Sequence, residues 1–232
     1  MEINNNVSPT LHPVNITSLK GYAAHEPHLN YITNSFEKAY DAVVKVRDAR
    51  NKLSLDTTRT KQAQVLHAAD LAEKHLTQLH KMFEVNWSRL NTNISSIEKA
   101  LTEPVREYAG MGVVSSEIRS HFKAMDASER RKAFNKALAA GDERTLKSVL
   151  GAPAYLSGLP DEEHEYLTRQ YHEQTNPEQS ERLELMKQVK AKMEAVQPVI
   201  VAEMHKALGA NAAEISQLRA RAAAAEAAIK FE

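Results

Sequence analysis

Apolar residues recur at alternating intervals of three and four over the segment 28–53. The repeated positions are Leu29, Ile32, Phe36, Ala39, Val43, Val46, Arg50 and Leu53, so that arginine stands at one of them. This spacing places the side chains along one face of a helix and is typical of the seam of a coiled coil. Ser54, Leu55 and Asp56 interrupt the repeat and predict a turn, with Ser54 and Asp56 as possible N-caps of the next helix.

A longer run with the same spacing follows this turn. It comprises Val65, Ala69, Ala72, Leu76, Leu79 and Phe83 and resumes at Leu90, Ile94, Ile97 and Leu101. Between the two parts, either Asn86 forms a polar layer or the seam shifts by one residue through Trp87. Both alternatives leave the helix continuous. The two runs therefore predict a long antiparallel helical hairpin, similar to a coiled coil, over residues 28–109.

The segment 110–177 shows shorter apolar runs that are separated by capping residues. Expected helix N-caps are Ser115 or Ser116, Asp126, Asp142 and Asp161, and expected helix ends are Gly141 and Gly151. Aspartate and serine side chains accept hydrogen bonds from the free amides of a helix start, and glycine adopts the backbone conformation that ends many helices. We therefore expect a bundle of short helices in this segment.

The two ends of the chain have contrasting patterns. Residues 1–27 contain three prolines and a run of asparagines, which disfavour a helix and predict an extended N-terminal arm. Residues 178–232 predict a C-terminal helical hairpin, with a long amphipathic helix, a turn at Gly209 and an alanine-rich final helix. No segment of useful length alternates as a strand does. The predicted fold class is all-α, a long hairpin followed by a C-terminal multi-helix region.

Composition excludes several functional classes. The chain has 30 Lys plus Arg against 30 Asp plus Glu, so it lacks the excess positive charge of a nucleic-acid coat protein. It has no Cys, which removes thiolate metal sites and cysteine nucleophiles. Histidine and carboxylate spacings typical of helical metal sites, phosphate loops and hydrolase nucleophile motifs are also missing. We expect a protein that is not an enzyme and needs no metal or cofactor, with no membrane span and no secretory signal.

Apolar residues in segments with few helix-forming signals are the candidate interface. These are Val7, Leu11, Val14 and Ile16 in the arm, Trp87 at the seam irregularity, and Tyr155, Leu156 and Leu159 in a connector that contains Gly and Pro. Tryptophan and tyrosine are enriched at protein interfaces. The alternative for Trp87 and for the connector is burial in the protein's own core.

Two further hypotheses concern charged and metal-binding groups. A cluster of Arg130, Arg131, Lys132 and Lys136 could contact an anion, which would make the protein a nucleic-acid-binding or regulatory helical adaptor; the alternative is a solvated helix face. A metal site assembled from distant helices would use residues such as His67, His75, His205 and Glu203. We expect neither DNA nor metal to be the main partner.

The region 116–204 resembles small helical proteins that are encoded among the structural genes of tailed bacteriophages and prophages. The residues that carry the resemblance are Ala140, Gly141 and Asp142, then Leu150, Gly151, Ala152, Pro153, Tyr155, Leu156, Ser157, Gly158 and Leu159, then an acidic helix start and a later helix rich in Gln and Lys. The resemblance implies a structural or assembly role and no active-site residues. The expected partners are further copies of the chain or a portal, capsid or tail component, in the virion or in the host cytoplasm during assembly.

Overall fold

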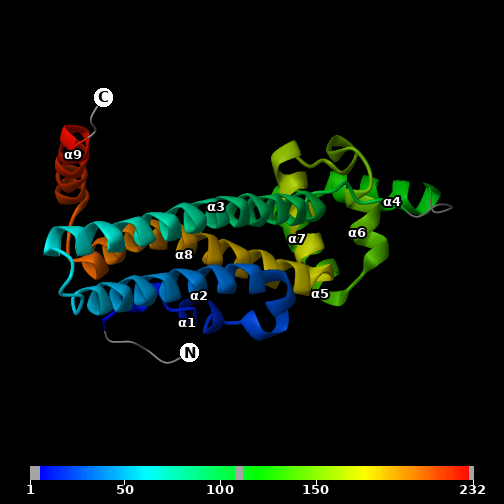
Figure 1. Cartoon of the computed structure of the whole chain (residues 1–232). Helices are drawn as coiled ribbons and strands as arrows, with labels where there is room; N and C mark the ends of the chain where they lie inside the picture. Colours follow the sequence, from blue (N-terminus) through cyan, green and yellow to red (C-terminus); the bar gives the residue numbers. More distant parts are fainter. Residues whose placement is uncertain (1–5, 108–111, 230–232) are drawn as a thin grey trace. The chain divides into compact units, whose positions relative to one another are not determined.

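The computed structural model describes residues 6–107 and 112–229, in which every regular element is a helix (Figure 1). The α-helices are α1 Val14–Thr17, α2 Tyr22–Leu53, α3 Lys61–Leu101, α4 Gly112–Ala124, α5 Ala127–Ala140, α6 Glu143–Leu150, α7 Asp161–Thr175, α8 Pro177–Leu208 and α9 Ala212–Ile229. Two short 3-10 helices, η1 Pro9–Leu11 and η2 Ala154–Ser157, complete the set. The predicted all-α class and the packing of α2 against α3 are confirmed.

The chain forms two compact units. Unit 1 comprises residues 1–92 and 184–232, and unit 2 comprises residues 93–183. This division differs from the four consecutive segments 1–27, 28–109, 110–177 and 178–232 that the sequence predicts. The reason is that most of α8 belongs to the same unit as the hairpin of α2 and α3, and a seam pattern does not reveal which other helix covers it.

Unit 1 is built on α2, α3 and α8, which run side by side (Figure 1). Phe36 of α2 and Phe83 of α3 have ring centroids 6.0 Å apart in its core. The Asn86 side-chain amide donates to the Ser35 hydroxyl at 2.7 Å and to the Tyr31 carbonyl at 3.3 Å. Asn86 is therefore a polar layer that links α3 to α2, the first of the two alternatives for the seam.

The predicted extended arm 1–27 is corrected over residues 6–27, which contain η1, α1 and the start of α2. Residues 1–5 lie outside the described residues. Pro9 and Pro13 stand at the starts of η1 and α1, where the missing amide hydrogen of proline costs no hydrogen bond. Both short helices pack against α2, which begins at Tyr22 and not at residue 28. The backbone amide of Ser8 donates to a Glu203 carboxylate oxygen of α8 at 3.0 Å.

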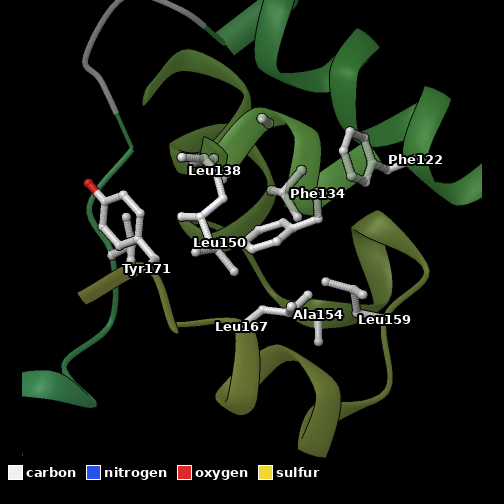
Figure 2. Packing of buried hydrophobic residues seen from close by; sticks show 12 residues of the cluster. Phe122, Phe134, Leu138, Leu150, Ala154, Leu159, Leu167 and Tyr171 are labelled. Carbon is white, nitrogen blue, oxygen red and sulfur yellow. The ribbon is translucent and has the colours of Figure 1, made fainter. Parts of the chain in front are cut away.

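Unit 2 has its own apolar core. Figure 2 shows Phe134, Leu150 and Leu167 converging from α5, α6 and α7, and the exposed fraction of each side chain is at most 2 %. The predicted N-caps Asp126 and Asp142 are confirmed: their carboxylates accept from the amides of residues 129 and 145, at 2.8 and 3.1 Å. Asp142 has a pKa below its ordinary value because the hydroxyl and amide of residue 145 donate to its carboxylate.

The other two predicted caps in unit 2 are wrong. Helix α4 begins at Gly112, so Ser115 lies inside it, where its hydroxyl accepts from Ser148 at 3.0 Å. Pro160 is the N-cap of α7, and Asp161 is the first helical residue, where its charge stabilises the helix dipole. A capping residue and a residue of the first turn therefore carry similar sequence signals.

Candidate partner-binding groove

An apolar groove lies between α3 and α8 in unit 1. It has a volume of about 710 Å³ and is lined by Leu76, Thr77, Leu79, His80, Lys81, Phe83, Glu84, Gln197, Pro198, Ile200 and Val201. Leu79, Phe83 and Ile200 are buried, but 45 % of the Val201 surface is exposed. A groove of this size and apolar character is the usual form of a binding site for a hydrophobic partner.

The sequence explains why this face of unit 1 remains open. In α3, Leu79 and Phe83 belong to the seam that packs on α2, whereas α8 presents Ile200 and Val201 one after the other, so that its apolar surface is broader than a single seam. In a three-helix arrangement, each helix buries the face that contacts the other two. The furrow between two of the helices is then not packed against a further helix. A fourth helix would complete the usual four-helix arrangement.

Polar side chains, two of them charged, border the groove on the α3 side. His80, Lys81 and Glu84 are exposed at the surface and contribute to its lining. Such residues keep the rim in contact with water while the apolar floor is available for burial, which is the usual anatomy of a protein interface. The groove can therefore bind an amphipathic segment through apolar contact and can select its direction through charge.

Helix α9 begins at one end of this groove. A neighbouring depression is lined by Ala69, Ala72, Glu73 and Leu76 of α3, by His205 and Leu208 of α8, and by Ala212, Ile215, Ser216 and Arg219 of α9. Leu76 lines both depressions, so they adjoin at this residue of α3. The Arg219 guanidinium lies 2.6 Å from Glu73 and 2.8 Å from Asp70, and hydrogen bonds to these two carboxylates raise its pKa.

The predicted interface residues divide into buried and exposed groups. Val7, Leu11, Ile16 and Leu159 are buried within the chain, and Val14 is exposed. In the connector, Tyr155 exposes 67 % of its surface and Leu156 exposes 38 %. Trp87 is half-buried, with the Lys190 ammonium of α8 at 5.0 Å from its ring centroid. Trp87 belongs to unit 1, and the connector belongs to unit 2.

The basic cluster is divided between internal contacts and solvent. Arg130 donates to the carbonyl oxygens of Phe122, Met125 and Gly158, so it fastens η2 to the corner between α4 and α5. Arg131 forms an ion pair with Glu163 of α7 at 3.1 Å. Lys132 and Lys136 are exposed. Two of the four cations therefore direct their donors to this chain's own groups, which weakens the hypothesis of a nucleic-acid adaptor.

The residues named for a metal site lie in separate surroundings. His75 faces α2 beside Lys45, and its pKa is below 6.5 because of partial burial and the charge of that lysine. His205 borders α9, and Glu203 accepts from Ser8 and pairs with Lys206. Within residues 6–107 and 112–229, no group of three or more His, Asp and Glu residues is close enough to hold a metal ion.

Sequence reasoning missed the groove and the position of α9 beside it. One available signal is the adjacent apolar pair Ile200 and Val201, since a helix with a single buried seam does not need both.

In the described part of the chain, no helix is long and apolar enough to cross a membrane. Comparisons with protein-family models, curated proteins and solved structures find no match.

Proposed function

We propose that this chain is a non-enzymatic assembly protein, and that unit 1 holds a helix of a binding partner in the groove between α3 and α8. The observation that supports this proposal is an apolar floor, with Val201 exposed, between two long helices. Among the residues that the structure describes, only those of α3 and α8 line this floor. A helix that lies in a hydrophobic groove is a recurrent mode of recognition, in which apolar side chains at intervals of three and four supply the affinity.

The energetics favour a helical partner. Removal of apolar surface from water contributes roughly 25 cal/mol per Å². A bound helix has already satisfied its backbone hydrogen bonds, so it can cover the groove without burying free amide or carbonyl groups. The charged rim at Lys81 and Glu84 stays in contact with water. A role in a phage-like particle, with further copies or a portal, capsid or tail protein as partner, rests on the resemblance of region 116–204.

The association state of the purified full-length chain tests this function. We expect an oligomer in sedimentation velocity, and we expect Val201→Glu to weaken the association at least tenfold because it places a charge on the groove floor. Val85→Glu is the matched control, since Val85 is also an exposed valine, 58 % accessible, and does not line the groove. A chain that remains monomeric at all concentrations, alone and with virion proteins, would contradict the proposal.

A further inference from the structure

Another depression of unit 1 lies between α2 and α3. Its volume is about 480 Å³, which is within the range of sites that hold small ligands. Two exposed lysines, Lys38 and Lys45, line it from α2, and the half-buried His75 lines it from α3. Of its lining residues, only the buried Leu79 also lines the groove between α3 and α8. The α2–α3 depression is therefore a separate candidate site.

Helix spacing and helix pairing bring its polar residues together. Lys38, Asp41 and Lys45 follow one another at intervals of three and four, which places them on one face of α2. The hydrogen bonds from Asn86 to α2 fix the antiparallel register of α2 and α3, and this register brings Lys45 level with His75. Lys38 stands two helical turns away, about 10 Å along the axis of α2.

The charges of the α2–α3 depression are unbalanced. Two lysines accompany one aspartate, Asp41, and within the described ranges none of the three belongs to an ion pair. Partial burial and the charge of Lys45 lower the pKa of His75 below its ordinary 6.5, so a second positive charge is disfavoured at this end of the depression. An anion between Lys45 and His75 would remove this repulsion.

The types of the lining residues favour a phosphate group over a carboxylate. Lysine offers a compact point charge, whereas the planar fork of arginine is the usual partner of a carboxylate, and no arginine of the described chain lines this depression. The two lysines exceed Asp41 by one positive charge, and a protonated His75 supplies a second. The two negative charges of a phosphate monoester balance them.

The floor of the depression is apolar. Ala42 and Leu79 are buried there, and Met82 is half-buried at the end away from His75. A phosphate group at the His75 end leaves this floor free for the rest of the ligand. An apolar body would cover the floor, and the removal of apolar surface from water would add to the affinity.

We propose that the α2–α3 depression binds a small organic phosphate, with the phosphate group between Lys45 and His75 and an apolar body over Leu79 and Met82. The phosphate oxygens accept hydrogen bonds from the Lys45 ammonium and the His75 ring. Lys38 closes the far end, where its apolar stem covers the body of the ligand. This site goes beyond the proposed function and does not depend on it.

Nuclear magnetic resonance of the histidine rings in the full-length protein tests the site. Phenyl phosphate is titrated at about pH 7, where a phosphate monoester carries nearly two charges. The signal of His75 is identified by its loss in His75→Gln. We expect this signal to move saturably towards the position of a protonated ring, because binding of the anion and protonation of the ring favour each other. Lys45→Gln is expected to weaken binding at least about tenfold, since a hydrogen bond to a charged group is lost.

Lys74→Gln is the matched control for the charge change. Lys74 is an exposed lysine next to His75 in the sequence, and it does not line the α2–α3 depression. Its replacement is expected to leave the affinity for phenyl phosphate unchanged. An equal loss of affinity in the two lysine variants, or a His75 signal that does not saturate, would overturn the inference.

A second phosphate ester distinguishes an organic ligand from a free anion. Methyl phosphate carries the same charges with almost no apolar body, so it is expected to bind about tenfold more weakly than phenyl phosphate. Equal affinities would overturn the organic part of the inference and would assign the site to the anion alone. Neither result depends on the association state of the chain, so a failure here leaves the proposed function in place, and a monomeric chain leaves this site in place.

Discussion

Gly151 lies where two backbone segments of unit 2 approach too closely for a side chain. A Cβ atom there would be 2.6 Å from the Lys147 carbonyl oxygen and 2.9 Å from the Glu107 amide nitrogen. Gly151→Ala is expected to lower the free energy of unfolding by about 2 kcal/mol, because backbone neighbours cannot rotate away. Urea denaturation followed by circular dichroism measures this loss. Gly112→Ala is the control, since a Cβ at Gly112 meets nothing within 4 Å, and equal losses in the two variants would contradict the explanation.

His75 gives unit 1 a pH dependence whose sign follows from its lowered pKa. Burial and the Lys45 charge lower this pKa below the ordinary 6.5, so the unfolded chain binds a proton at a higher pH than the folded chain does. The contribution of His75 to the free energy of unfolding is therefore fully present above about pH 7.5, and it decreases as the pH falls through 6.5. His75→Gln is expected to reduce this fall in denaturation midpoints measured between pH 7.5 and 5. The exposed His121→Gln control should keep the full dependence.

At the scale of the elements, Arg130 is the connection between η2 and the corner of α4 and α5. Its guanidinium donates to three carbonyl oxygens, including that of Gly158, where φ is 70°. Arg130→Met is expected to lower the free energy of unfolding by about 2 kcal/mol, because three part-buried carbonyl oxygens lose a charged donor. Hydrogen exchange should become faster in residues 154–158. Lys132→Met, at an exposed site two residues away, should leave that exchange unchanged.

The elements also show how far the sequence could predict the structure. The N-caps Asp126 and Asp142 could be predicted because a cap is a contact within three residues. The packing of η1 and α1 on α2, and the bond from Ser8 to Glu203, join residues that are distant along the chain, and no local pattern encodes them. The same limit applies to Arg130 and to the groove. A run of basic residues or an apolar seam shows which contacts a helix can make. Tertiary packing decides which other element it contacts.

At the scale of the whole molecule, unit 2 is formed by a continuous stretch that interrupts unit 1. Residues 184–232 follow unit 2 along the chain and belong to the same compact unit as the first 92 residues. Each unit contains fully buried aromatic side chains, Phe36 in the first and Phe134 in the second. Two separate cores imply that a cavity in one core affects mainly the contacts of its own unit, because packing losses act on neighbouring side chains.

The single tryptophan makes this independence measurable. Trp87 lies in unit 1, so its fluorescence reports that unit alone, whereas circular dichroism reports the helices of both. Phe134→Ala is expected to lower the free energy of unfolding of unit 2 by about 3–5 kcal/mol. Part of the circular dichroism transition should then occur at a lower denaturant concentration, while the fluorescence transition keeps its midpoint. Phe36→Ala should shift the fluorescence transition instead. If Phe134→Ala moves both signals equally, the two units unfold as one cooperative body, since α3 and α8 each run through both units and would then transmit the loss.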